Sequence, residues 1–449
     1  MSETAHDNST AGQHSSADVP DGTATAMDGA VERDSRAPDG AAPFGEYVRN
    51  WALRVRRGES GMLPVLVGLV IIVIFFQIKS PVFLSAGNLA NLLTQGSALI
   101  LLAMAEVFVL LIGEIDLSIG FVGALSAVAT VSLSSTTFGP SWPWWIALIA
   151  GLAVGAVICA LQGLLITMLG LPSFVVTLAG LLGWQGVLIY SINEIGGPAA
   201  GGTLTISNNV ISGMVNSNMS PVLGWTVTIV ALVLYAIVVL RRSASQHARN
   251  LVTEPFALTV IKFVAVAVAA VAAVLICNVN RGRGTAELRG VPWVVPIIVA
   301  VLVLWTFLLN RTRFGKYLYA IGGNSEAARR AGISLFRIRM AAFTLGGVTA
   351  ALAGIVFASR LGSSSSNIDG GQLVLYAVAA AVIGGTSLFG GRGKMIHALV
   401  GGLIVAVINS GMGLIGLQAS TQLIVTAIVL IAAVVVDAVS GRSRRQTTH

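Results

Sequence analysis

Charged side chains are scarce in this chain. Only 10% of its 449 residues are Asp, Glu, Lys or Arg, whereas 55% are hydrophobic and the mean hydropathy is +0.85. A soluble domain usually carries about 25% charged residues. The composition therefore excludes a soluble protein of ordinary type.

Cysteine and histidine are also rare. Cys159 and Cys277 fall within or at the end of apolar runs, so we expect small packing residues and no disulfide framework. The five histidines are scattered, and no group of His, Cys and carboxylate residues has the spacing of metal ligands. We expect neither a metal nor a cofactor.

The motifs of nucleotide binding and nucleophilic catalysis are missing as well. The glycine-rich segment GGTSLFGGRGK at 384–394 is no phosphate-binding loop, because Met395 follows Lys394 and no glycine stands five residues before Gly393. No Gly-x-Ser-x-Gly elbow with plausible partners stands out. We therefore predict no catalytic residues, and we expect that the chain is not an enzyme.

Long apolar runs dominate what is present. About twelve recur, most of them long enough to span a bilayer. They are Met62–Ile78, Leu89–Ile112, Ile119–Leu133, Trp144–Leu169, Phe174–Tyr190, Val222–Leu240, Phe256–Cys277, Val291–Leu309, Met340–Ala358, Leu373–Thr386, Ala398–Leu417 and Leu423–Val439. The third and the tenth are short enough to be broken or re-entrant. This pattern predicts an all-α, polytopic integral membrane bundle of roughly 10–12 transmembrane helices.

Basic residues collect at the borders of these runs, although the net charge is +8. The pattern does not suggest nucleic acid, because the charges do not share one face of a soluble domain. The four clusters are Arg49, Arg54, Arg56 and Arg57; Arg241 and Arg242; Arg311, Arg313 and Lys316; and Arg442, Arg444 and Arg445. Alternating spans place all four on one side, which predicts cytoplasmic termini. The loop Asn278–Gly290 is an exception, since its arginines would lie outside.

The chain divides into a tail and one membrane domain. Residues 1–43 have almost no large apolar side chains, so we expect a disordered cytoplasmic tail. Residues 44–60 are predicted as an interfacial helix, 61–440 as the transmembrane domain and 441–449 as a cytoplasmic tail. The 51 glycines suggest close helix packing and broken helices. A weak echo between Leu101–Val128 and Leu373–Val407 indicates either an internal duplication or a coincidence.

A polar, charged segment interrupts the apolar pattern at 311–339. Within YAIGGNSEAARRAGI, starting at Tyr319, the residues Ser325–Arg330 predict a short helix that Asn324 or Ser325 caps and Gly332 ends. A short helix at the inner membrane surface suits the docking of a cytoplasmic partner. An ordinary positively charged loop is the alternative.

A second polar segment, GEIDLSIG from Gly113 to Gly120, separates two apolar runs. Two carboxylates near membrane depth are costly and usually face the bundle interior or a cavity. The segment therefore indicates either a helix break that lines a solute path or a short loop at the membrane surface. Glu106, deeper in the preceding run, slightly favours the buried position.

Four segments together resemble the permease subunits of bacterial ABC sugar importers of the ribose, xylose, arabinose and galactose type. They are GEIDLSIG at Gly113, PSFVVTLAG at Pro172, YAIGGNSEAARRAGI at Tyr319 and VIGGTSLFGG at Val382. The resemblance runs from about residue 60 to the C-terminus. The extra run Phe256–Cys277, with RGVP at Arg289–Pro292, is more similar to the xylose permeases. Arg392 and Lys394 in the last glycine turn, and the long N-terminal tail, depart from the pattern.

The resemblance implies a function and partners. It implies import of a monosaccharide, such as the pentose xylose, by alternating access across the bacterial inner membrane. The implied partners are a cytoplasmic ATPase subunit that hydrolyses ATP, an extracytoplasmic sugar-binding protein, a second copy of this chain and membrane lipid. The residues expected to contact the ATPase are Gly323, Asn324, Glu326, Ala327, Arg329, Arg330 and Gly332. Candidates for the translocation path are Asn91, Gln95, Glu114, Asp116, Ser118 and Gln185.

Two other classes of protein remain open at this point. An ion-coupled secondary sugar transporter would need membrane carboxylates, and Glu106, Glu114 and Asp116 could serve. An integral-membrane enzyme would need a convergent nucleophile, base or metal set, which the sequence does not offer.

Overall fold

The computed structural model describes residues 62–197, 201–247, 256–282 and 287–446. The predicted N-terminal tail and interfacial helix, and the last three residues, lie outside this part of the chain. Within these residues, the regular secondary structure consists of helices and two three-residue strands, joined by turns and loops. The elements are α2 (Leu63–Lys79), α3 (Ala86–Leu111), α4 (Ile119–Ser134), α5 (Trp144–Leu169), α6 (Ser173–Gly196), β1 (Thr203–Thr205), α7 (Asn209–Asn216), α8 (Pro221–His247), α9 (Phe256–Asn278), α10 (Val294–Arg311), α11 (Arg313–Gly323), α12 (Ser325–Arg330), α13 (Leu335–Leu361), β2 (Ser363–Ser365), α14 (Gly370–Ile383), α15 (Met395–Leu414) and α16 (Ala419–Gln446).

Eight of these helices are long and apolar enough to cross a bilayer, namely α3, α5, α6, α8, α9, α10, α13 and α15. Four shorter apolar stretches lie in α2, α4, α14 and α16. Each apolar run of the sequence corresponds to one of these helices, so the prediction of an all-α membrane bundle is confirmed. The two runs expected to be short are α4, with 16 residues, and α14, with 14.

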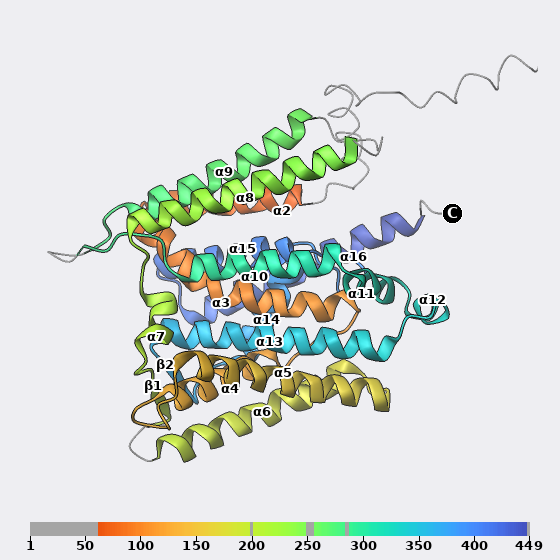
Figure 1. Cartoon of the computed structure of the whole chain (residues 1–449), viewed down its shortest axis with the longest axis horizontal. Coiled ribbons are helices and arrows are strands. Elements are labelled where there is room, and N and C mark those ends of the chain that lie inside the picture. Colours follow the sequence, from red (N-terminus) through yellow and green to blue (C-terminus); the bar gives the residue numbers. More distant parts are fainter. Residues whose placement is uncertain (1–61, 198–200, 248–255, 283–286, 447–449) are drawn as a thin grey trace, which may run out of the picture.

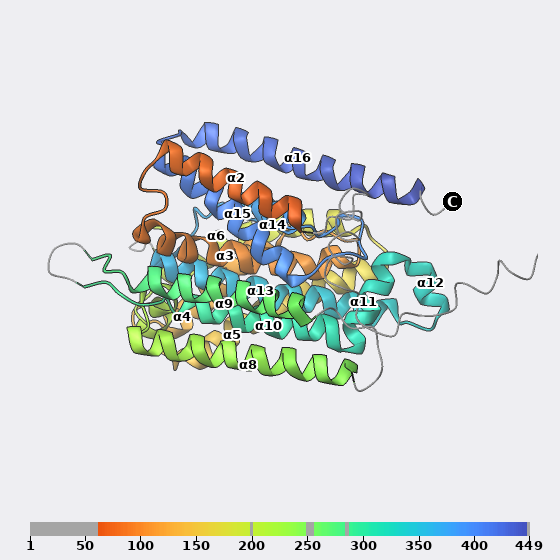
Figure 2. The same cartoon turned by 90° about the horizontal axis from the view of Figure 1, so that it is seen from above.

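The long helices lie side by side, and the bundle has two distinct ends (Figure 1, Figure 2). We call the end that carries α11 and α12 the inner end. The opposite end, which we call the outer end, carries α7 and the antiparallel pair β1–β2. The described residues on both sides of the break at 283–286, which follow α9, also lie at the outer end. There Arg281 donates to the Gly290 carbonyl at 2.8 Å, and Arg289 pairs with Glu287 at 3.3 Å.

Three helices form the centre of the bundle. α3 is buried along most of its length and packs against α13 and α15. α13 also packs against α4 and α5, and glycines permit the close approach. A Cβ on Gly123 of α4 would lie 2.7 Å from the Ala350 carbonyl oxygen of α13, and one on Gly354 would overlap Gly123. The glycine-rich composition therefore serves close helix packing, as expected in lipid.

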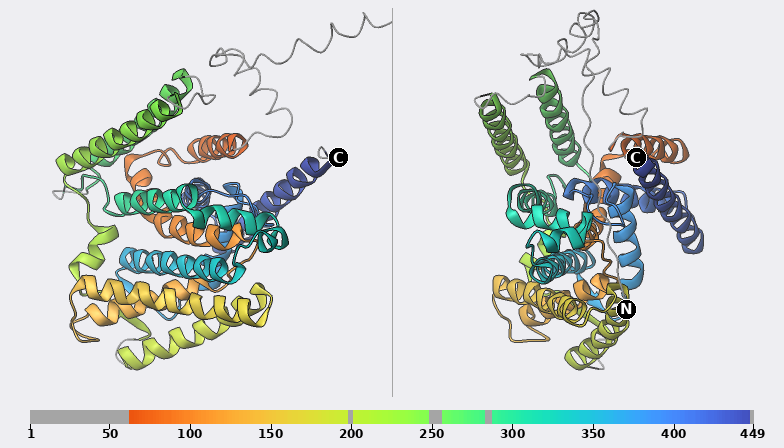
Figure 3. Two further views of the ribbon diagram at one scale, coloured as in Figure 1. Left: turned by 45° about the vertical axis from the view of Figure 1, so that its right-hand side comes forward. Right: turned by 90° about the vertical axis from the view of Figure 1, so that its right-hand side faces the viewer.

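The outward helices expose apolar side chains. α8 and α9 stand apart from the centre at one edge (Figure 3), and Leu234 and Val238 on α8 are each 58% exposed. Exposed apolar surface on this scale is unfavourable in water but neutral against lipid tails. The packing agrees with a protein embedded in a bilayer.

Candidate coupling and translocation sites

The predicted docking helix exists as α12. The Asn324 side chain caps it by accepting a hydrogen bond from the Ala327 N–H at 2.9 Å. Gly332 follows the helix with φ of +80°, a left-handed conformation that glycine adopts without strain. Only Ala328 of the helix is buried. The prediction of a short, capped helix is confirmed, and its remaining surface is open at the inner end.

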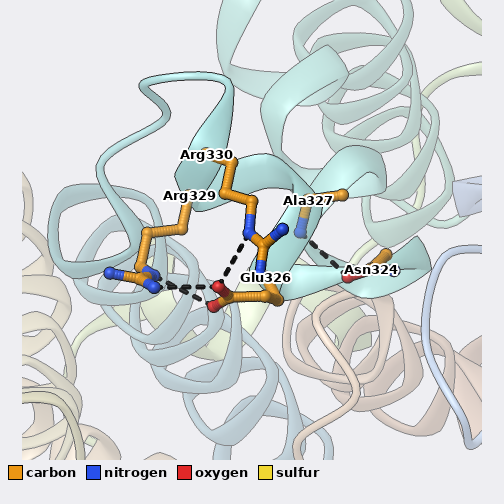
Figure 4. A network of polar contacts seen from close by, with 5 residues as sticks. All are labelled: Asn324, Glu326, Ala327, Arg329 and Arg330. Atoms are coloured by element: carbon orange, nitrogen blue, oxygen red, sulfur yellow. Dashed lines mark hydrogen bonds and ion pairs between the residues drawn. The ribbon is translucent and has the colours of Figure 1, made fainter. Parts of the chain in front are cut away.

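Ion pairs organise the exposed face of α12 (Figure 4). The Glu326 carboxylate accepts two hydrogen bonds from Arg329, at 2.8 and 3.0 Å, and one from Arg330 at 3.1 Å. These bonds lower the pKa of Glu326 below its ordinary value. A lowered carboxyl pKa means that the pairs persist at neutral pH and are lost only as the pH falls through that pKa. The face therefore presents one carboxylate and two guanidinium groups in a fixed arrangement.

α11 connects α12 to the centre of the bundle. A Cβ on Gly322 would overlap the carbonyl oxygen of Leu111, the last residue of α3, and would lie 2.4 Å from the Gly391 nitrogen. Gly391 itself donates to Leu111 at 2.9 Å. Tyr319 donates from its hydroxyl to the Gly393 carbonyl at 2.8 Å, and burial raises the pKa of its phenol.

Three chain segments therefore meet at one point, which we call the inner junction. It comprises the end of α11 at Gly322, the end of α3 at Leu111 and Gly113, and the glycine turn at Gly390 and Gly391. Backbone lies directly on backbone here, because a Cβ on Gly390 would come within 2.9 Å of both the Gly113 nitrogen and the Gly322 carbonyl oxygen. The inner junction therefore joins α11 to the end of α3 and to the turn that follows α14 through direct backbone contacts.

The segment between α3 and α4 is a helix break within the bundle, and Asp116 lies inside it. The Asp116 carboxylate is 1% exposed and accepts from the Ser118 backbone N–H at 2.9 Å and from its hydroxyl at 2.6 Å. The Ser118 hydroxyl also lies 3.0 Å from the Gln162 side-chain oxygen of α5, and Cys159 lies 3.6 Å from Asp116. The sequence left open a helix break within the bundle or a short loop at the membrane surface. Asp116 and Ser118 are buried, as the helix break requires.

The other carboxylates of this region have different surroundings. Glu114 is mostly covered and pairs with Arg339, at the start of α13, across 3.6 Å. Glu106, on α3, is fully buried, and neither carboxylate oxygen has a hydrogen-bond partner in the described residues. Glu114 thus links the α3–α4 segment to α13 by an ion pair near the inner end. Glu106, in contrast, is a buried carboxylate without a hydrogen-bond partner among the described residues.

The remaining candidates for the path are dispersed. Asn91 is exposed near the start of α3, toward the outer end, and Gln95 lies one turn later, half-buried, with its side-chain oxygen unpaired. Gln185 is half-buried on α6. The hydrogen bonds among the described residues link Asp116 with Ser118 but link neither of them to Asn91, Gln95 or Gln185. A path through all six residues stays a prediction.

Sequence reasoning missed the inner junction. From the sequence, the turn at 384–394 was analysed only for the phosphate-binding loop pattern, which it does not match. Its contact with the segment that carries α12 was not predicted. The available signal was the pair of adjacent glycines in both segments, Gly322–Gly323 and Gly390–Gly391. Paired glycines mark places where backbones approach closely.

Replacing Gly322 by Ala should separate the inner junction, because its methyl group has no room beside Leu111 and Gly391. Overpacking of this kind costs about 1–3 kcal/mol, so we expect a lower unfolding temperature and slower uptake. Gly323→Ala is the matched control for the unfolding temperature, since a Cβ there meets nothing within 4 Å. Uptake is not compared between the two variants, because Gly323 belongs to the predicted ATPase contacts. Thermal unfolding of both purified variants is the measurement. Equal behaviour of the two would show that the junction does not constrain the chain.

Comparisons with known proteins identify the family of the chain. Residues 88–434 match the family described as branched-chain amino acid transport system / permease component. The xylose transport system permease protein of Haemophilus influenzae is 32% identical over 382 residues, which cover 83% of this chain and 94% of that protein. The D-allose transport system permease protein of Escherichia coli is 30% identical over 372 residues, covering 82% and 88%. The ribose import permease protein of Escherichia coli is 29% identical over 372 residues, covering 83% and 92%. No solved structure matches the chain.

Proposed function

The chain belongs to the family of branched-chain amino acid transport system permease components, and on that premise we propose that it forms the membrane path of an ATP-driven importer for a monosaccharide. It is a multi-pass permease component of a sugar ABC transport system in the bacterial inner membrane. We propose xylose as its first substrate to test. Xylose permeases are among the relatives, but those named for allose and ribose are almost as similar.

The observation that carries this proposal is the contact between α11, the end of α3 and the glycine turn. A permease driven by a separate ATPase needs an exposed docking element and a stiff connection from that element to its gating helices. α12 supplies the exposed element, and the inner junction supplies the connection to α3 and α14. We propose that α12 and its two flanks contact the ATPase through Gly323, Asn324, Glu326, Ala327, Arg329, Arg330 and Gly332, and the exposure of this helix supports that proposal.

The partners follow from the same mechanism. A cytoplasmic ATPase subunit would bind α12, and an extracytoplasmic sugar-binding protein would deliver sugar to the outer end. A second copy of the chain would complete the path between two bundles, with Asn91, Gln95, Glu114, Asp116, Ser118 and Gln185 as candidates for its polarity. The inner end then faces the cytoplasm. This orientation follows the preference of basic residues for the cytoplasmic side, since Arg313, Lys316, Arg329 and Arg330 lie at the inner end. It would place both termini in the cytoplasm.

One observation favours a second function, an ion-coupled secondary sugar transporter. The unpartnered carboxylate of Glu106, close to the Asp116 network, is the kind of intramembrane group that binds a coupling ion or proton. This alternative gives no role to the exposed, ion-paired α12. We therefore prefer the ATP-driven importer.

Uptake by proteoliposomes distinguishes the two functions. The chain is reconstituted with its ATPase subunit, and radiolabelled D-xylose, D-ribose and D-allose are supplied together with the binding protein. We expect the sugar to accumulate only when ATP is supplied on the side of the ATPase subunit. This accumulation should persist when ionophores dissipate the ion gradients. We also expect no ATPase activity from the purified chain alone. Accumulation without the ATPase subunit that collapses with ionophores would establish the ion-coupled alternative.

A further inference from the structure

A largely apolar cavity with several polar side chains in its lining lies at the outer end of the bundle, away from the inner junction and the Asp116 network. Its volume is about 290 Å³, and α4, α13, β2 and the start of α14 line it. Pockets for small ligands begin at about 300 Å³, so the cavity has the size for a small solute. β2, whose residues line the cavity, lies at the end opposite α12, where an importer would receive its substrate (Figure 1).

The lining combines hydroxyl, amide and carboxylate groups with an apolar floor. All three residues of β2, Ser363–Ser365, contribute, and Asn367 and Asp369 come from the loop that follows it. Gln372 comes from the first turn of α14, and Phe357 on α13 contributes to the floor. A small number of polar groups above an apolar surface is typical of sites for small polar molecules.

The backbone around these groups is fixed. β2 pairs with β1 in the register Thr203↔Ser365 and Thr205↔Ser363. Leu204, between the two threonines, is fully buried and anchors β1 in the core. Alternate residues of a strand share a face, so Ser363 and Ser365 lie on the same face of β2. The serines of the cavity are therefore held in place before any ligand arrives.

Several polar groups of the cavity have unused hydrogen-bonding capacity. One oxygen of Asp369 caps α14 by accepting from the Gln372 N–H at 2.9 Å, and the Gln372 amide donates to the Tyr376 hydroxyl at 3.0 Å. The second carboxylate oxygen, the Gln372 side-chain oxygen and the Asn367 amide make no hydrogen bond within the described residues. Asn367 and Asp369 are exposed, so these groups can bond to water until a ligand displaces it. Carboxylate and amide oxygens accept hydrogen bonds from hydroxyl groups, and the Asn367 amide also donates.

We propose that this cavity is a monosaccharide-binding subsite within the permease, in which Asp369 and Gln372 accept hydrogen bonds from sugar hydroxyls and Phe357 supports the apolar face of the ring. This inference rests on the proposed function, since it assigns a receiving site to the transported sugar. α14 connects the subsite to the rest of the mechanism. It begins at the Asp369 cap and ends at the glycine turn, which reaches α11 at the inner junction.

Transport by a double variant tests the subsite. Asp369→Asn with Gln372→Met removes the charge and the amide, while Asn is still a good helix cap. We expect sugar uptake in the reconstituted complex to fall about tenfold, the usual effect of losing one charged hydrogen bond. The matched control is Ser366→Ala, because Ser366 lies on the same loop as Asn367 and Asp369 but does not line the cavity. Its hydroxyl donates instead to the Gly202 carbonyl, just before β1. ATP hydrolysis without the binding protein should be unchanged in both.

Each outcome of that measurement has one meaning. If the uptake rate of the double variant lies within twofold of that of the Ser366→Ala control, the proposal of a sugar-binding subsite is wrong. A higher half-saturating concentration of binding protein would also overturn it, because the cavity would then receive a segment of that protein. Failure of the unmodified complex to transport any of the three sugars with ATP would count against the proposed function instead.

A binding measurement is independent of transport. With Cys159 and Cys277 replaced by Ala, Ser365→Cys should react with a small hydrophilic thiol reagent, and D-xylose at tens of millimolar should slow that reaction severalfold. Glycine betaine at the same osmolarity should leave the rate unchanged, and Ser366→Cys should show no protection by sugar. Absence of protection of Ser365→Cys by D-xylose, D-ribose and D-allose would contradict a sugar-binding cavity.

Discussion

Reversing the charge of Glu326 is expected to reduce sugar uptake at least about tenfold while the chain still inserts into the membrane, since like charges brought together at an interface cost several kcal/mol. In Glu326→Lys, three cations would crowd the exposed face of α12 where one carboxylate now bonds Arg329 and Arg330. The surface offered to the ATPase would be disordered and uniformly positive. Uptake and the amount of ATPase subunit that copurifies with the chain are the two measurements.

Glu287→Lys provides the control for that variant. Glu287 forms a comparable exposed ion pair with Arg289 at the outer end, where no ATPase binds in the proposed arrangement. An exposed pair of this kind is worth about 0–1 kcal/mol, so uptake and copurification should be close to normal. Normal transport by Glu326→Lys would mean that α12 is an ordinary surface loop.

Replacing Asp116 by Leu is expected to have the second large effect. Leucine would leave the buried Ser118 N–H without an acceptor and would remove the turn that the carboxylate forms with it. A buried donor left unpaired costs about 1–3 kcal/mol, and the break would lose its fixed shape. We expect a lower unfolding temperature and strongly reduced uptake. Asp116→Asn retains the acceptor oxygen and should be much milder.

Glu114→Gln is the comparison for Asp116. Glu114 belongs to the same segment, but its ion pair with Arg339 is long, at 3.6 Å, and both side chains keep some contact with solvent. Its loss should change stability by less than the loss of Asp116. If Asp116→Leu and Glu114→Gln unfold and transport alike, the Asp116 network does not hold the break together.

Local signals in the sequence predict the local structure well. α12 follows from Asn324, good helix formers and Gly332, all within nine residues, and the apolar runs correspond to the helices because run length alone determines what can span a bilayer. Even the short α4 and α14 follow from the brevity of their runs. Burial of Asp116 was one of two alternatives, because the decisive contacts come from α5, where Cys159 reaches Asp116 and Gln162 reaches Ser118, each more than 40 residues away along the chain.

Contacts between distant segments could not be predicted in the same way. The meeting of Gly322, Leu111 and Gly391 depends on how three helices pack, and in a chain with 51 glycines no single glycine identifies such a contact. The path candidates were chosen for polarity alone. Polarity does not determine which helix face a residue occupies. Within the described residues, Asn91 and Gln185 make no hydrogen bond to the Asp116 network.

Site-specific photo-crosslinking from α12 tests the central claim most directly. A photoreactive phenylalanine derivative replaces Ala327, which is exposed on α12, and the assembled transporter is irradiated in membranes. We expect a crosslink to the ATPase subunit whose yield changes when ATP is bound, and no such crosslink from the same group at Val279, which is 52% exposed at the outer end. A transporter that imports sugar normally but gives no ATPase crosslink from position 327 would contradict α12 as the coupling element.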